Sequence, residues 1–272
     1  MSPDPAGHSA FVALGDERAV PDLAWIQALT GATRAEVEAI LRETDELVEI
    51  ENGIRHRHRE GGRDSYAQFR APFDLYVMVR LLRPIHVVET GVSSGISSAH
   101  LLLALRANGR GTLHSIDLPI PQRGPRLAES ESAVALPPGR TSGWAMPEEL
   151  RPGWDLHLGP SQVLLPVVTQ GIDRVDLFLH DSHHTPEHLT FELETVRPKL
   201  TPGAIVLADN VEWTGDAFDR FAASLKVPVL ARGGEDLVGL RVPPTAADGP
   251  ASRRAGVGSP ATKKRRPPRA KS

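Results

Sequence analysis

The chain of 272 residues carries 31 Lys and Arg against 34 Asp and Glu, a formal net charge of −3, and 40% of its residues are apolar. The absence of cysteine excludes a disulfide framework, a thiolate nucleophile and a Cys-ligated zinc site. No apolar run approaches the roughly 18 residues of a membrane span, and residues 1–5 lack the pattern of a signal peptide. We therefore expect a cytoplasmic protein with no membrane partner.

The N-terminal part of the chain indicates a helical region. Residues 1–20 are rich in Pro, Gly and Ala and are expected to be disordered. Residues 21–83 form the expected helical extension, which would cap the substrate side. Within it, Thr33 and Glu36 have the spacing of a capping box. A further helix is predicted over 71–82, because Arg83-Pro84 stops it.

Residues 84–242 alternate between strand and helix patterns, which predicts an α/β protein with a doubly wound, mostly parallel seven-stranded sheet. The last two strands are joined by a short link and predict a C-terminal antiparallel hairpin. The expected strands are 85–89, 112–117, 154–158, 175–180, 204–208, 227–231 and 236–241, and the expected helices are 95–107, 161–169, 186–197 and 216–225.

Two segments stand outside this alternation. Residues 118–152 are rich in Pro, Gly and Ser and are long for a loop, so we expect a lid insertion. Residues 243–272 are expected to be a disordered tail. From Arg253 to Ser272 this tail carries eight Lys or Arg and no acid, which leaves about −11 on residues 1–252. The tail has no interleaved aromatic residues, so it supports nucleic-acid contacts of a non-specific kind only.

Acidic residues follow several of the expected strands. Glu89, Asp117, Asp181 and Asp209 each stand at a strand's carboxyl end or directly after it. Ligands of open α/β sheets bind at these ends. The pattern predicts that the four carboxylates surround one cleft.

The first two acidic positions indicate an adenosyl ligand. Gly91 and Gly95 lie between a strand and a helix, where free N–H groups favour a carboxylate or phosphate and Ser97 adds a hydroxyl donor. Asp117 is placed to accept both hydroxyls of a ribose. The alternatives are a plain glycine-rich turn and a solvated strand-end aspartate. The third glycine of a dinucleotide motif is missing, which disfavours a nicotinamide-dependent oxidoreductase.

The next positions indicate an adenine contact and a metal site. Ser161 and Gln162 start a helix, where they would either cap it or reach an adenine edge. Asp181, Asp209 and Asn210 offer the hard oxygen ligands that Mg²⁺ prefers. The alternative for the last two is that they cap the following helix.

Histidines gather after the fourth expected strand. His184 and His183 are candidate general bases, and we favour His184 because it lies three residues past Asp181. His188 is expected on a solvated helix face, and His180 is expected in the core.

These residues together resemble the class I S-adenosylmethionine-dependent methyltransferases over about residues 84–242, most closely the metal-dependent O-methyltransferases of the catechol and caffeoyl-CoA type. The resemblance implies a Rossmann-like fold, Mg²⁺ as a cofactor at Asp181, Asp209 and Asn210, and S-adenosylmethionine as methyl donor. The cofactor residues it implies are Glu89, Gly91, Ser93, Gly95, Ser97, Asp117, Ser161, Gln162 and Asp181.

The chain departs from the catechol-type enzymes where they have a lysine base and it has His184. In this it is similar to enzymes that methylate sugars of macrolide antibiotics, which however have an acidic pair where this chain has Asp209-Asn210. The expected acceptor is a hydroxyl of a small molecule, with Tyr66, Phe69 and Arg70 as a hypothetical substrate wall. A nucleic-acid methyltransferase, a non-catalytic binding protein and homo-oligomer formation stay open as alternatives.

Overall fold

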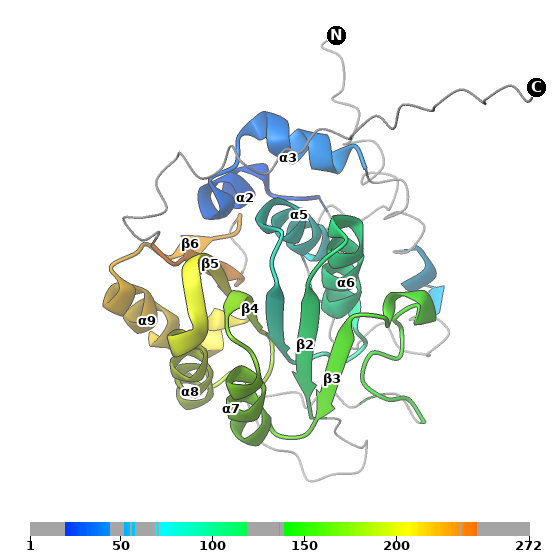
Figure 1. The fold of residues 1–272 in the computed structure, drawn as a ribbon. Coiled ribbons are helices and arrows are strands. Elements are labelled where there is room, and N and C mark those ends of the chain that lie inside the picture. Colours follow the sequence, from blue (N-terminus) through cyan, green and yellow to red (C-terminus); the bar gives the residue numbers. More distant parts are fainter. Residues whose placement is uncertain are drawn as a thin grey trace, which may run out of the picture.

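The computed structural model describes residues 20–43, 52–54, 56–57, 69, 71–118, 136, 139–233 and 236–243. At its centre lies a seven-stranded sheet in the order β3-β2-β1-β4-β5-β7-β6, parallel from β3 to β5 and antiparallel in its last two pairings (Figure 1). The strands are β1 His86–Thr90, β2 Thr112–Asp117, β3 Trp154–Leu158, β4 Val175–His180, β5 Leu200–Ala208, β6 Leu230–Ala231 and β7 Val238–Arg241. The expected sheet and its C-terminal hairpin are therefore confirmed.

Helices cover both faces of this sheet. The described α-helices are α2 Leu23–Thr30, α3 Arg34–Leu41, α5 Pro72–Leu82, α6 Ile96–Asn108, α7 Ser161–Gly171, α8 Pro186–Val196 and α9 Ala217–Leu225. Within the same residues lie the short 3₁₀ helices η2 Glu148–Leu150, η3 Arg197–Lys199 and η4 Val211–Trp213. None of the helices in the described ranges is long and apolar enough to cross a membrane.

Successive side chains of the strands enter two different cores, because a strand alternates its faces. Val87 of β1 packs in the cluster formed with α2, α3, α5 and α6, whereas its neighbour Val88 packs in the cluster formed with α7, α8 and α9. Leu207 and Val206 of β5 divide in the same way. Burial on both faces explains the nearly continuous apolar runs of these strands.

The strand register brings the expected site residues to one edge of the sheet. Thr90, the last residue of β1, pairs with Ile116 of β2 and with His180 of β4. His180 in turn pairs with Ala208 of β5. The residues that follow these positions therefore emerge side by side at the carboxyl ends of four neighbouring strands.

The N-terminal helix α2 packs against α5 and against the edge of the sheet that contains β6 and β7. The predicted capping box of Thr33 and Glu36 is present at the start of α3. Arg232, next to β6, pairs with the buried Asp74 of α5 at 3.2 Å. Burial raises the pKa of Asp74 to about 6, even though the charge and hydrogen bond of Arg232 oppose it. Trp25 of α2 also donates to the carbonyl of Leu230 at 2.8 Å.

The sixth strand is shorter than predicted. Strand β6 comprises residues 230–231 rather than 227–231. Pro228 interrupts the expected run, and proline has no N–H for a strand ladder. The fifth strand instead begins four residues early, at Leu200, with a register shift against β4 between Val175 and Leu177.

Candidate cofactor and catalytic site

The turn after β1 approaches the end of β4 very closely. Gly91 has φ +85°, and a Cβ placed on it would lie 1.8 Å from the carbonyl oxygen of Asp181. Its own N–H donates to the carbonyl of Ile116 in β2 at 2.9 Å. Only glycine fits here without moving backbone, so Gly91 sets the spacing between two of the predicted site segments.

The same turn contains a strained serine with an unsatisfied hydroxyl. Ser93 has φ +48°, an uncommon conformation for a residue with a side chain. Its Oγ is buried and has no hydrogen-bond partner among the described residues. Strain and an orphaned buried polar atom concentrate at ligand sites. This hydroxyl therefore fits a polar group of a bound cofactor.

Glu89 lies beneath the turn and is fully buried. Its Oε1 accepts the hydroxyl of Ser97 at 2.5 Å, and its Oε2 accepts those of Ser98 and Ser115 at 2.6 and 2.7 Å. Burial raises the pKa of Glu89 to about 7, the serine hydroxyls oppose this, and the charge of Asp181 adds to it. In this structure the hydroxyl of Ser97 and the carboxylate of Glu89 thus bond to each other. Both residues remain predicted cofactor residues.

Asp117 keeps free acceptor capacity at the end of β2. Its Oδ1 accepts the N–H of Val92 at 3.1 Å, and its Oδ2 accepts the hydroxyl of Ser142. Two carboxylate oxygens offer about four acceptor positions, so about two remain. The remaining acceptor positions of Asp117 therefore fit the two hydroxyl donors of a ribose, as the sequence predicts.

The last part of the expected lid insertion covers the glycine turn. The N–H groups of Gly143 and Ala145 donate to the carbonyls of Ser93 and Ser94 at 2.8 and 3.0 Å. A Cβ on Gly95, which has φ +91°, would lie 2.8 Å from the Cα of Gly143. Sequence reasoning missed Ser142 and this packing, since the insertion has no periodic pattern. Residues 119–135 of the insertion lie outside the described residues.

Ser161 and Gln162 both contact one histidine. The Oγ of Ser161 lies 2.9 Å from His188 Nε2, and Nε2 of Gln162 lies 2.9 Å from His188 Nδ1. Pro160 is the N-cap of α7, and Ser161 makes no capping bond, so the capping alternative is wrong. The expectation of a solvated His188 is also wrong, because this side chain is buried between α7 and α8.

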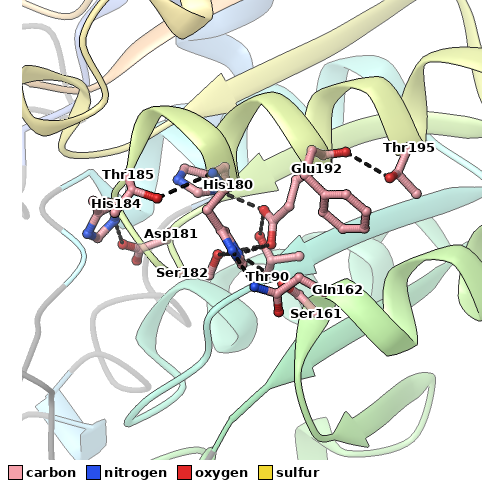
Figure 2. A network of polar contacts seen from close by, with 12 residues as sticks. Thr90, Ser161, Gln162, His180, Asp181, Ser182, His184, Thr185, Glu192 and Thr195 are labelled. Atoms are coloured by element: carbon pink, nitrogen blue, oxygen red, sulfur yellow. Dashed lines mark hydrogen bonds and ion pairs between the residues drawn. The ribbon is translucent and has the colours of Figure 1, made fainter. Parts of the chain in front are cut away.

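A buried carboxylate organises the segment behind these residues (Figure 2). Glu192 of α8 accepts from Thr90 Oγ1 at 2.6 Å and from Ser182 Oγ at 3.0 Å. Its two oxygens also lie 2.7 Å from His180 Nδ1 and 2.9 Å from His188 Nε2. Burial opposes ionisation, yet the hydrogen bonds of the two histidines hold the pKa of Glu192 well below its usual range. His180 is fully buried, as expected.

The two candidate bases point to different neighbours. His184 Nε2 lies 3.6 Å from Asp181 Oδ1, and its ring stands edge-on to Trp213 of η4 at 6.2 Å. The ring of His183 instead stands edge-on to His188 at 5.3 Å. His184 is therefore the histidine beside the expected metal segment, as the sequence spacing suggested.

The expected metal ligands sit on adjacent strand ends. The N–H of Asp209 donates to the carbonyl of His180 at 3.0 Å, which places Asp209 beside Asp181. Burial raises the pKa of Asp181 to about 7, with His180 opposing and Asp117 adding to it. Asn210 has φ +52° and precedes η4 without a side-chain capping bond, so its amide is not used as a cap.

These oxygens fit a hard cation in their chemistry. The spacing of the ligand atoms fits a bound cation less well. In the described part of the chain, one set of three His, Asp or Glu donors has ligand atoms within 4.8 Å of one another, namely His114, Asp155 and His157. Asp181, Asp209 and His184 do not form such a set. Of the expected substrate wall, Phe69 is buried, and Tyr66 and Arg70 lie outside the described residues.

Comparison with known proteins agrees with this architecture. Residues 88–211 match the family model described as a methyltransferase domain. A search of the curated proteins gave no significant match. Among solved structures, the chain is similar to an O-methyltransferase from Bacillus cereus in complex with S-adenosylhomocysteine, with a TM-score of 0.50 and 13% identity over 79% of this chain and 99% of that chain.

The chain is also similar to the O-methyltransferase TomG from Streptomyces achromogenes, involved in tomaymycin synthesis and solved with S-adenosylmethionine, with a TM-score of 0.49 and 21% identity over 72% of this chain and 89% of that chain. The family match identifies a methyltransferase domain over residues 88–211, and the likeness to the Bacillus cereus structure shows the Rossmann-like fold that the sequence predicts.

Proposed function

We propose that this chain transfers the methyl group of S-adenosylmethionine to a hydroxyl of a small molecule, with Mg²⁺ held by Asp181, Asp209 and Asn210. The observation that carries the proposal is the placement of His184 against Asp181, at the same sheet edge as Asp117. In this proposal Asp117 positions the cofactor, and a base beside the carboxylates of Asp181 and Asp209 activates the acceptor hydroxyl.

The chain's own residues would divide the work as follows. Asp117 and Ser93 would hold the cofactor at the turn after β1 and the end of β2. Asp181, Asp209 and Asn210 hold the cation, which when bound lowers the pKa of a nearby hydroxyl. His184 accepts the proton of the acceptor hydroxyl as its oxygen forms the bond to the methyl carbon and the sulfur–carbon bond breaks. The products are a methyl ether and S-adenosylhomocysteine.

The cofactor part is tested by calorimetric titration of the full chain with S-adenosylhomocysteine and with NAD, each with and without Mg²⁺. We expect S-adenosylhomocysteine to bind in both buffers and NAD not to bind. Binding of NAD alone would move the chain to the oxidoreductases.

The metal part is tested with Mn²⁺, whose electron paramagnetic resonance signal weakens on binding. Asp209→Asn should lose Mn²⁺ binding and keep S-adenosylhomocysteine binding, because the metal would touch the acceptor and not the adenosyl group. Asp219→Asn, on the exposed side of α9, is the matched control. Equal Mn²⁺ binding by both variants would refute the metal site.

The base is tested by methyl transfer to a panel of catechol, caffeoyl and sugar hydroxyls. His184→Gln should lose roughly 10²–10⁴-fold in rate, the usual share of a general base, and the loss should shrink as pH rises. His183→Gln should keep most of the activity. The opposite result would move the base to His183, and a methyl transfer insensitive to EDTA would reject the metal-assisted mechanism.

A further inference from the structure

A second group of convergent donors lies away from the candidate active site, where β2 meets the edge strand β3. The Oδ2 of Asp155 lies 3.0 Å from His114 Nδ1 and 2.9 Å from His157 Nε2. His114 and Asp155 are direct partners in the β2–β3 register, and His157 follows on the same strand face. Two rings thus converge on one carboxylate oxygen.

These side-chain contacts form a row that continues from His114 to His86 of β1 and then to Asp173. His114 Nε2 lies 3.0 Å from His86 Nδ1, and His86 Nε2 lies 3.5 Å from Asp173 Oδ1. A ligating histidine commonly donates its other ring N–H to such a partner, which fixes its tautomer. The structure therefore supplies both a donor set and the support behind it.

These contacts are compatible with a cation on His114 Nδ1. His114 Nε2 would then donate to His86 Nδ1, and His86 Nε2 would face Asp173.

We propose that His114, Asp155 and His157 form a zinc site that fastens the edge strand β3 to β2. Two imidazoles and one carboxylate suit Zn²⁺ and similar transition metals, whereas Mg²⁺ prefers oxygen ligands throughout. Around a tetrahedral zinc with bonds of about 2.0–2.1 Å, ligand atoms lie roughly 3.3 Å apart. The two separations from Asp155 Oδ2 need to widen by only a few tenths of an ångström, and the ligand atoms of the two histidines lie within 4.8 Å of each other.

The exposures of the three side chains fit this role. The side chain of His114 is 10% exposed and forms a rigid anchor, whereas those of His157 and Asp155 are 31% and 50% exposed. The outer ligands are free to adjust, and a water molecule has access to the fourth position. Strand β3 also leads directly into Ser161 and Gln162, so the metal would fix the strand before the predicted adenine-side segment.

The test uses the full chain without a histidine tag, titrated with Zn²⁺ by calorimetry in excess Mg²⁺. We expect one Zn²⁺ per chain. His157→Gln and Asp155→Asn should each weaken binding at least roughly tenfold, and His86→Gln should weaken it by about 10–100-fold through the loss of ligand support. His56→Gln, an exposed histidine outside the row, should bind like the parent chain.

Stability gives a second measurement. At a Zn²⁺ concentration of about 100 times the dissociation constant, the melting temperature of the parent chain should rise by roughly 5–10 °C. The His157→Gln variant should fold, since its side chain is on the surface, and should show no such rise. Equal Zn²⁺ affinity in the His157→Gln and His56→Gln variants, or an equal melting shift in both, would overturn the proposal.

Discussion

The packing of Gly91 against the end of β4 can be tested with one methyl group. In Gly91→Ala the new Cβ would meet the backbone oxygen of Asp181 at 1.8 Å, and no side-chain rotation relieves this contact. Gly153 is a matched control, because its φ of +88° is close to the +85° of Gly91 and nothing lies within 4 Å of its Cβ position. Both substitutions should carry the backbone cost of roughly 1–2 kcal/mol that a side chain has at positive φ.

Gly91→Ala should cost more than the control, because the ends of β1 and β4 must also move apart. Overpacking of this kind typically costs a further 1–3 kcal/mol, so we expect about 2 kcal/mol between the two variants. Urea unfolding followed by circular dichroism measures the difference, which corresponds to roughly 4–8 °C in melting temperature for a domain of this size. Equal destabilisation within about 0.5 kcal/mol would show that these strand ends are not closely packed.

Three further outcomes follow from the site. Asp117→Ala should weaken S-adenosylhomocysteine binding by on the order of 1.5–3 kcal/mol, from the loss of charge-assisted hydrogen bonds, and an unchanged affinity in calorimetry would remove Asp117 from the site. Glu192→Gln should lower the free energy of unfolding by roughly 3 kcal/mol or more at pH 7, because four partners, three of them buried, lose an ionised acceptor. The deficit should shrink in urea titrations as pH falls, since the pKa of Glu192 is lowered in the folded state. For Glu89 the dependence of stability on pH has the opposite sign. Its pKa in the folded state, about 7, exceeds the ordinary 4.5, so its contribution to stability is present below pH 4.5 and is lost as pH rises through 7. Glu89→Gln should therefore flatten the fall in stability between pH 5 and 8, and an unchanged slope would contradict the assignment.

The sheet and the positions of its carboxyl ends follow from local sequence patterns. Strands such as β2 and β4 were predicted to the residue, because short apolar runs are bounded by glycine, proline or acidic residues. Once strand and helix alternate, the parallel order places Asp117, Asp181 and Asp209 at one edge. The start of the sixth strand was predicted wrongly, because the apolar run continues through Pro228, which cannot join the ladder.

The side-chain contacts of the site were not predictable in the same way. Ser142 reaches Asp117 from an insertion whose path has no periodicity. Ser161 has the residue type and position of a cap, yet it bonds to His188 instead, because α8 packs beside α7 and brings that ring into reach. Each of these contacts depends on the distance between elements far apart in the chain, about which local propensity says nothing.

Glu192 shows most clearly what such tertiary contacts contribute. In the sequence it is one more acidic residue in an amphipathic helix, and it would be assigned to the solvent. In the structure it joins Thr90 at the end of β1 to Ser182 beyond the end of β4 (Figure 2). Through His188 it also reaches Ser161 at the start of α7. A buried carboxylate is costly unless fully paired, and here each partner belongs to a segment that the proposed reaction needs held still. The residue that links the predicted cofactor and base segments therefore lies behind them, on a helix that would touch neither the cofactor nor the acceptor.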